Sequence, residues 1–262
     1  MAGRQRNFKG VHKMNKVLVY DIETAPMVAY VWELKDQFIA INQIVSDTYM
    51  LAWSAKWLGD PPSKIMYYDQ RNAKDMSKDK PILEPLWKLL DEADIAITQN
   101  GQSFDSRVIN ARFIMNGMKP PSPYKHLDTY RIAKRIARFT SNKLEYLTDK
   151  LCTKYKKKLH HSFPGMSLWK GCLDGNIKAW NEMKRYNIYD VLSTEELYGK
   201  LRAWTPESMP NVFNVNHPHT DCRVCGPGTK MWHKGSEIKK SGRFHRYQCQ
   251  GCFAWTTGEK IK

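Results

Sequence analysis

The sequence lacks long apolar runs, internal repeats and low-complexity tracts. No apolar run approaches the roughly 18 to 20 residues that a membrane-spanning helix needs. The basic N-terminal stretch also lacks the apolar centre of a signal peptide. Cysteine is scarce, with six residues among 262, and four of these form two close pairs near the C-terminus, which does not suit a disulfide framework. We therefore expect an intracellular, cytoplasmic protein with reduced thiols and no membrane partner.

Acidic residues are in the minority, with 26 Asp plus Glu against 42 Lys plus Arg and a net charge of +16. The excess lies mainly at the two ends. Residues 1–16 have five basic and no acidic side chains, and residues 222–262 have nine basic against two acidic. Such ends favour a polyanion, because each neutralised phosphate releases condensed counterions. Nucleic acid is the predicted partner, while charge for solubility and an anionic membrane surface are the alternatives.

Apolar residues make up 42% of the chain and aromatic residues 12%, which excludes a mainly disordered protein. This content can build one large domain and a small one. The segment 205–221 contains three Pro and little periodicity, which indicates a linker. We predict a basic N-terminal tail at 1–15, a large domain at 16–204, a linker at 205–221 and a small module at 222–258.

Apolar periodicity predicts an α/β domain. Residues 16–20 form a short apolar run typical of a strand that is buried on both faces. The predicted strands are residues 16–20, 48–57, 64–68 and 94–98, and the predicted helices are 81–93, 104–116, 128–139, 141–151 and 177–204. This order predicts a sheet with an antiparallel edge and helices on both faces.

Two acidic side chains lie at the end of the first predicted strand. Asp21 and Glu23 are two residues apart, so they lie on one face of an extended chain. Two carboxylates that converge among apolar residues repel each other unless a cation compensates them. A divalent ion explains this placement, although an Asp-x-Glu by itself is frequent by chance.

Two further segments carry candidate site residues. Asp105 lies in the first turn of a predicted helix, at the sheet edge where α/β proteins bind ligands. The alternative is that Asp105 only interacts with the helix N-terminus. Tyr186 and Asp190 are four residues apart on the long helix and therefore share a face, a pairing that is usually structural.

Together these segments resemble the DEDD superfamily of 3′-to-5′ exonucleases, which have an RNase H-like fold and include the proofreading domains of family A and B DNA polymerases. The sequence has DIET at 21–24, NGQSFD at 100–105 and YNIYD at 186–190, in the order of the three family motifs. Tyr186, with Arg185 rather than His before it, places the resemblance in the tyrosine subclass. LDT at 127–129 and NKLEYL at 142–147 extend the resemblance to about residues 14–204, but residues 152–175 depart from it.

The resemblance implies a mixed five-stranded sheet flanked by helices, and a two-metal-ion phosphodiesterase that releases 5′-mononucleotides from 3′ ends. It implies two Mg²⁺ or Mn²⁺ ions held by the four carboxylates, because these oxygen ligands suit both metals. Tyr186 would orient the attacking water, since a phenol is a poor base at pH 7. The implied catalytic residues are Asp21, Glu23, Asp105, Tyr186 and Asp190.

Contacts to the substrate are predicted at Thr24, Asn100, Phe104 and Lys143, with the core as the alternative place for Phe104. Arg131, Lys134, Arg135 and Arg138 have helical spacing and predict a basic stripe along the phosphates, with a solvated face as the alternative. The charge run at 154–158 is interpreted as a solvated helix end or loop.

The two cysteine pairs predict a structural zinc site with four thiolates. Cys222 and Cys225 form one C-x-x-C, Cys249 and Cys252 form the other, and 23 residues separate the two pairs. A redox dithiol pair is the alternative. Strands are predicted at 230–233 and 243–248. Residues 242–257 resemble the zinc ribbons of transposases and other DNA-acting proteins, which implies nucleic-acid binding and suggests a virus-encoded or mobile-element protein acting in a host cell.

The leading hypothesis is thus a stand-alone 3′-to-5′ exonuclease that prefers DNA with single-stranded 3′ ends, with RNA as a further substrate. A separate DNA polymerase or a replication or repair protein would be its partner. The alternatives are a structure-selective endonuclease of the junction resolvase type and a non-catalytic nucleic-acid-binding protein.

Overall fold

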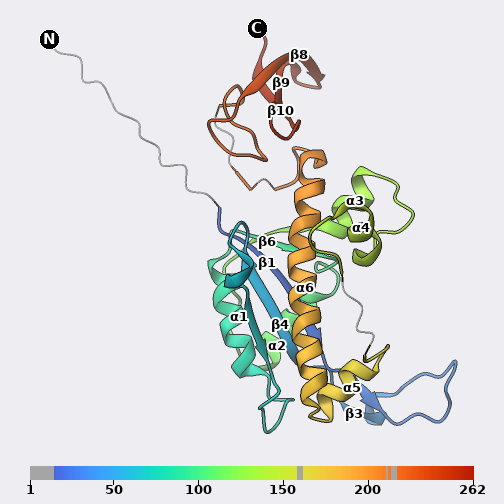
Figure 1. Cartoon of the computed structure of the whole chain (residues 1–262). Helices are drawn as coiled ribbons and strands as arrows, with labels where there is room; N and C mark the ends of the chain where they lie inside the picture. The colour runs from blue at the N-terminus through green and yellow to red at the C-terminus, as the bar shows by residue number, and fades with distance from the viewer. Residues whose placement is uncertain (1–14, 158–161, 211, 214–216) are drawn as a thin grey trace. The chain divides into compact units, whose positions relative to one another are not determined.

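The computed structural model describes residues 15–157, 162–210, 212–213 and 217–262 (Figure 1). Two compact units are present, Lys16–Arg202 and Ala203–Lys262. The predicted basic tail falls outside the described residues, apart from Asn15. Within the described ranges, none of the helices combines the length and apolarity needed to span a bilayer.

The larger unit is built on a mixed sheet of five strands in the order β5-β4-β1-β6-β7. The central strand β1 (Val17–Thr24) pairs antiparallel with β4 (Met50–Trp57) and parallel with β6 (Ile95–Thr98). At the edges, β5 (Met66–Asp69) pairs antiparallel with β4, and β7 (Lys125–Asp128) pairs parallel with β6. The predicted mixed five-stranded sheet is confirmed.

Alternation along β1 separates an apolar face from a face that carries acid groups. Leu18, Tyr20 and Ile22 pack against α1 (Lys80–Glu92) and α2 (Asp105–Met115). The opposite face of the sheet is covered by the long helix α6 (Ile177–Leu201), which α5 (Ser167–Leu173) contacts (Figure 1). Because side chains alternate along a strand, Asp21 and Glu23 lie on the α6 side.

Several element boundaries differ from the sequence predictions. The strand β1 continues to Thr24, so the acidic pair lies within the strand. The strand β7 was not predicted, because its residues KHLD form neither an apolar run nor a clear alternation, and only its last residue was assigned, as a helix start. The helix α3 (Thr129–Ile136) ends at an extended Ala137, so Arg138 is not on the helix and the predicted four-residue stripe is wrong at its last position. Helix α4 spans Leu144–Leu151.

Residues 25–47 were not assigned to any element from the sequence. They form the short strands β2 (Val28–Ala29) and β3 (Ile44–Ser46), which pair antiparallel. The connection between these strands exposes large apolar side chains, including Trp32, Leu34 and Phe38.

A buried ion pair ties α1, α2 and β4 together. The Asp79 carboxylate accepts from Arg112 Nε at 2.7 Å, from Met50 N at 2.9 Å and from Asn116 Nδ2 at 2.9 Å. With its carboxylate oxygens hydrogen-bonded, this buried charge is compensated.

The smaller unit contains an antiparallel sheet in the order β10-β9-β8. Its strands are β8 (Met231–Lys239), β9 (Gly242–Cys249) and β10 (Trp255–Lys260), so two of them extend the predicted strands and the third was missed. The start of the predicted linker is hydrogen-bonded to this unit, since Thr257 N donates to Glu207 Oε1 at 2.6 Å. The predicted domain boundaries otherwise stay predictions.

Candidate active site and metal centre

Three carboxylates from distant parts of the sequence meet between β1 and α6. Oxygen atoms of Asp21, Glu23 and Asp190 lie within 4.8 Å of one another. Asn187, one turn before Asp190 on α6, donates from Nδ2 to Asp21 Oδ2 at 2.7 Å, and its carbonyl accepts from Ser54 Oγ of β4 at 2.9 Å. These bonds fix the helix against the two strands and so hold Asp190 beside the acidic pair of β1.

Asp105 lies beside this cluster but outside the group of three. It is the first residue of α2, is buried, and accepts through Oδ1 from the Ile22 backbone amide at 3.3 Å. The Ile22 amide can take this partner because β6 pairs with β1 only along Val17 to Val19 and ends before Ile22. The structure thus brings the four predicted carboxylates into one region, with three close together and the fourth alongside.

Burial and mutual repulsion make the deprotonated cluster unfavourable. Burial raises the pKa of Glu23 to about 8, and the negative charge of Asp190 adds to this shift. Burial likewise raises the pKa of Asp105 to about 7 and the pKa of Asp21 well above its ordinary value. A bound cation would compensate these charges, and the ligand set of carboxylate oxygens fits Mg²⁺ or Mn²⁺.

Two site residues come from the segment that sequence reasoning left unexplained. Lys157 Nζ lies 2.5 Å from Asp190 Oδ2 and 4.5 Å from the centre of the Tyr186 ring. Trp169 of α5 donates from Nε1 to Glu23 Oε2 at 3.2 Å. The interpretation of 154–158 as a solvated run is therefore wrong for Lys157, whose side chain is 20% exposed. Lys158 falls outside the described residues.

No sequence signal singled out Lys157, because it is one of several lysines in a short charge run. Its charge lowers the pKa of both Asp21 and Glu23, although burial has the larger, opposite effect. Burial would lower the pKa of Lys157 itself, but the charge of Asp190 and the hydrogen bond to it hold that pKa above its ordinary value. Lys157 is thus a charged member of the site.

Tyr186 keeps its proton at neutral pH. Burial raises the pKa of its phenol above the ordinary value, and the charge of Asp190 raises it further. The Trp169 ring packs edge-on against Tyr186, with ring centres 6.3 Å apart. A phenol that stays protonated can donate a hydrogen bond but cannot serve as a general base.

The turn between β6 and α2 presents two predicted substrate residues. Asp128 accepts from the backbone amides of Asn100 at 2.8 Å and Gln102 at 3.2 Å, and also caps the N-terminus of α3. Gly101 packs tightly here, since a Cβ at this position would lie 2.4 Å from Thr98 Oγ1. Phe104 is 46% exposed, so the alternative that placed it in the core is wrong.

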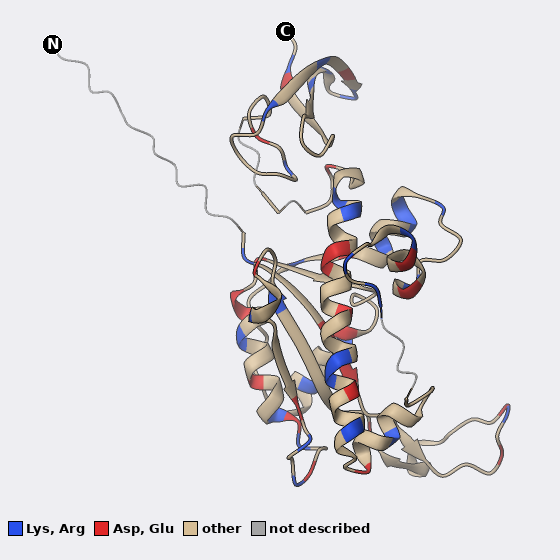
Figure 2. Ribbon diagram, viewed as in Figure 1, with Lys and Arg blue, Asp and Glu red and all other residues tan. Residues whose placement is uncertain are grey.

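The other predicted substrate residues lie on the surface. Arg131 and Arg135 are exposed on α3, whose ribbon is blue where Lys and Arg lie (Figure 2), and Lys143 is exposed just before α4. Thr24 is partly exposed at the end of β1. Their roles in substrate binding stay predictions.

Glu23→Gln should stabilise the protein in the absence of added Mg²⁺ or Mn²⁺. A carboxyl whose folded pKa is about 8 instead of 4.5 stabilises the fold below about pH 4.5, and this contribution is lost as the pH rises to about 8. Between pH 4.5 and 8, the free energy of unfolding of the wild type should therefore fall by roughly 1 to 3 kcal/mol more than that of the variant. The measurement is thermal unfolding across this pH range.

The matched control is Glu84→Gln, which removes an exposed carboxylate on α1. It should leave the pH dependence unchanged. Adding Mn²⁺ should raise the unfolding temperature of wild type more than that of Glu23→Gln. Equal pH dependence in wild type and Glu23→Gln would contradict the raised pKa.

The four predicted zinc ligands form a second cluster in the smaller unit. The sulfur atoms of Cys222, Cys225, Cys249 and Cys252 lie within 4.8 Å of one another. The Sγ atoms of Cys222 and Cys252 are 3.5 Å apart, and those of Cys225 and Cys249 are 3.9 Å apart.

The two C-x-x-C turns have the same local structure. In each turn, the sulfur of the first cysteine accepts a hydrogen bond from the backbone amide two residues later. Val224 N donates to Cys222 Sγ, and Gly251 N donates to Cys249 Sγ, both at 3.3 Å. The residue four positions after that cysteine has a positive φ, 99° at Gly226 and 61° at Phe253. Amides directed at sulfur stabilise thiolates, so this donor set fits a tetrahedral zinc ion.

A sequence profile of the RNase H superfamily matches residues 57–202, more than half of the chain. The chain therefore belongs to the RNase H superfamily. The match includes Asp105, Tyr186 and Asp190, and it begins after the strand that carries Asp21 and Glu23. The RNase H-like fold predicted from the motifs is confirmed, and this fold indicates a hydrolase that cleaves nucleic acid.

The structure of the family B DNA polymerase from the hyperthermophilic archaeon Pyrobaculum calidifontis is similar, with a TM-score of 0.51 and 14% identity. The similarity covers 72% of this chain and 25% of the polymerase chain, so this protein spans about a quarter of the polymerase's length. At this identity the similarity shows the fold alone. No curated protein matched the sequence.

Proposed function

We propose that the protein is a metal-dependent 3′-to-5′ exonuclease that hydrolyses DNA, and also RNA, to 5′-mononucleotides. The observation that carries this proposal is the convergence of Asp21, Glu23 and Asp190 within 4.8 Å, with Asp105 beside them. The four carboxylates come from three motifs whose order resembles that of the tyrosine-subclass exonucleases. The resemblance also supports the direction of cleavage.

Each carboxylate has a distinct place in the proposed mechanism. Asp21, Glu23 and Asp190 would hold one Mg²⁺ or Mn²⁺, and Asp21 together with Asp105 would hold a second. Bound there, such ions lower the pKa of a water and neutralise charge on the leaving oxygen. The position of Asp105 outside the close group agrees with a ligand that acts largely through water.

The remaining site residues position the reacting groups. Tyr186 keeps its proton and donates a hydrogen bond that orients the attacking water. Asn100 and the half-exposed Phe104 contact the terminal nucleotide, with the Phe104 ring available for stacking on a base. Lys157 holds the Asp190 carboxylate in place and brings a positive charge towards the scissile phosphate.

The smaller unit would bind one structural zinc ion and add affinity for nucleic acid. Two linked binding units raise the effective concentration of the strand at each of them. The expected substrate is a single-stranded 3′ end, presented by a separate DNA polymerase or a replication or repair protein.

The proposal is tested by incubating the protein with 5′-labelled single-stranded DNA, duplex DNA and RNA. The reactions contain Mg²⁺, Mn²⁺ or chelator, and products are resolved by length. We expect a ladder that shortens from the 3′ end, depends on metal and releases 5′-mononucleotides, with single-stranded DNA degraded fastest.

The same experiment separates the alternatives. A single internal cut in place of the ladder would instead indicate a structure-selective endonuclease. Binding without cleavage under every metal condition would indicate a non-catalytic nucleic-acid-binding protein. A 3′-labelled strand is the control, because an exonuclease acting from the 3′ end removes that label in its first step.

A further inference from the structure

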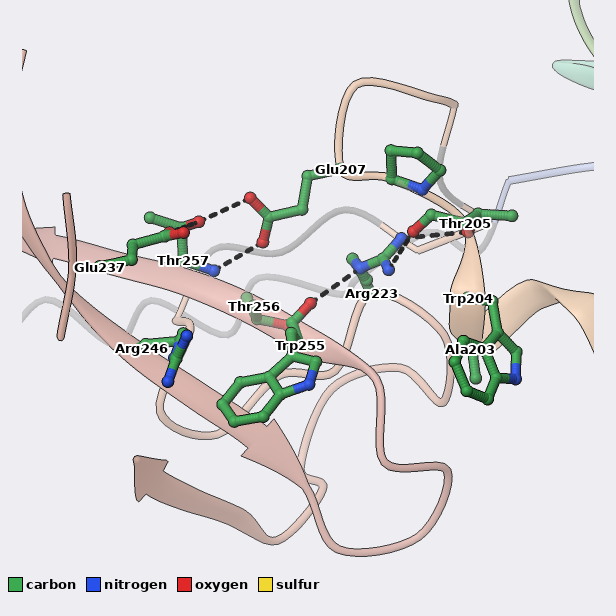
Figure 3. A pocket seen from close by; sticks show the side chains of 11 residues that line it. Ala203, Trp204, Thr205, Glu207, Arg223, Glu237, Arg246, Trp255, Thr256 and Thr257 are labelled. Atoms are coloured by element: carbon green, nitrogen blue, oxygen red, sulfur yellow. Dashed lines mark hydrogen bonds between the residues drawn. The ribbon is translucent and has the colours of Figure 1, made fainter. Parts of the chain in front are cut away.

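The smaller unit contains a cavity of about 330 Å³ that neither metal cluster uses. Figure 3 shows it between the start of β10 and the chain around Thr205. One part of its wall is well fixed. Arg223 donates from Nε to the Trp255 carbonyl at 3.0 Å and from Nη1 to Thr205 Oγ1 at 3.2 Å. Glu207 accepts from the Thr257 amide at 2.6 Å.

Two polar groups of the lining lack hydrogen-bond partners among the described residues. Thr256 is 4% exposed and its Oγ1 is buried without a partner, and the buried Nε of Arg246 has none either. A buried polar group without a partner costs about 1 to 3 kcal/mol. Because both atoms are fully buried, they lie beneath the surface of the cavity and do not face its ligand.

The cavity also presents aromatic surface. Trp204 is 75% exposed and Trp255 is 39% exposed, and in Figure 3 their indole rings lie on either side of Arg223. The Arg246 guanidinium lies over the Trp255 ring, 4.4 Å from its centre. Aromatic rings and guanidinium planes are the surfaces on which nucleobases stack.

The charges around the cavity favour a base inside and phosphates outside. Glu207 and Glu237 line the cavity. Both accept a hydrogen bond from the Thr257 hydroxyl, and both form a salt bridge with Lys239. Carboxylates in the wall disfavour a phosphate inside. The hairpin of β8 and β9 carries exposed basic residues that can bind a phosphate backbone: Lys234, Lys239, Lys240 and Arg243.

We infer that this cavity binds a single nucleobase, which stacks on the exposed ring surface of Trp255. The base belongs to a nucleic-acid strand or to a free 5′-mononucleotide. The inference rests on the proposed function in taking nucleic acid as the ligand, and it adds a second nucleotide site that does not include the carboxylate cluster.

The test uses the full-length, zinc-loaded protein with Asp21→Asn, so that the strand is not consumed. Its binding to a fluorescein-labelled dT 12-mer and to an abasic chain of twelve tetrahydrofuran phosphates is measured by fluorescence anisotropy. Adding Trp255→Ala should weaken binding of the dT 12-mer about 5- to 50-fold and leave binding of the abasic chain unchanged.

Trp232→Ala is the matched control, because Trp232 is a partly exposed tryptophan of the same sheet outside the cavity lining. It should have a much smaller effect than Trp255→Ala. Trp255→Phe should restore most of the affinity, and zinc content and unfolding temperature verify that each variant is folded. Quenching of tryptophan fluorescence by dTMP that depends on Trp255 would identify the free nucleotide as a ligand, and its absence would restrict the site to strands.

An equal loss on both chains would overturn the inference in favour of a backbone contact. An unchanged affinity of Trp255→Ala, or an equal loss in Trp232→Ala, would also overturn it. The result is independent of catalysis. If wild type cleaves DNA and Trp255→Ala binds normally, the cavity inference alone fails. If wild type cleaves nothing and Trp255→Ala still loses base-dependent affinity, the proposed function alone fails.

Discussion

Asp21→Asn should lower the rate of metal-dependent cleavage about 10³-fold or more. Asparagine keeps the size of the side chain and can still accept from Asn187 Nδ2, but it removes one negative charge from the ligand set. In the proposed mechanism Asp21 would help to hold both metal ions, so its loss would affect activation of the attacking water and stabilisation of the leaving oxygen together. Initial rates on a 5′-labelled single strand, over a range of Mn²⁺ concentrations, provide the measurement.

The control for this prediction is Asp174→Asn, which removes an exposed carboxylate after α5. It should retain cleavage within about twofold, as expected for a surface substitution away from the site. The unfolding temperature of Asp21→Asn should equal or exceed that of wild type, because the substitution relieves repulsion among Asp21, Asp190 and Asp105. Full activity of Asp21→Asn would contradict the site assignment.

Cys249→Ala should abolish zinc binding and unfold the smaller unit while the larger unit remains folded. The buried core of the smaller unit is small, and it includes two of the cysteines themselves, Cys222 and Cys249, with Val224 and Ala254. So little apolar burial cannot stabilise sixty residues alone, and metal binding supplies folding free energy in such modules. Zinc content by atomic spectroscopy and amide hydrogen exchange resolved along the chain measure both effects.

Cys152→Ala gives the matched control, since Cys152 is a buried cysteine of the larger unit outside the four-sulfur cluster. We expect this variant to retain one zinc ion and to lose stability in residues 16–202 instead. Normal amide protection of β8, β9 and β10 in zinc-free Cys249→Ala would show that the smaller unit folds without metal.

Local sequence patterns were enough to predict site residues where the spacing of residues directly determines their geometry. The two-residue spacing of Asp21 and Glu23 defines one face of a strand, and the C-x-x-C pairs define two turns that can share one ion. Both signals arise within a few residues, so they can be recognised before the fold is known. The placement of Asp190 beside them followed from the order of the motifs, which is a resemblance rather than a geometric derivation.

Long-range contacts explain what the sequence did not reveal. Lys157 belongs to the site because an ion pair joins it to Asp190, 33 residues further along the chain. Its neighbours in the charge run are equally basic, so composition cannot distinguish it. The strand β7 was missed for a similar reason, since pairing with β6 defines it and its four residues show no clear period.

The early end of the pairing between β6 and β1 makes the position of Asp105 depend on chain length. Its carboxylate takes the Ile22 amide that a longer β6 would have used. One residue added to the turn before α2 would displace the start of the helix and carry this carboxylate away from the amide. In related proteins, the turn between β6 and α2 should therefore tolerate substitutions at exposed positions but keep the same number of residues.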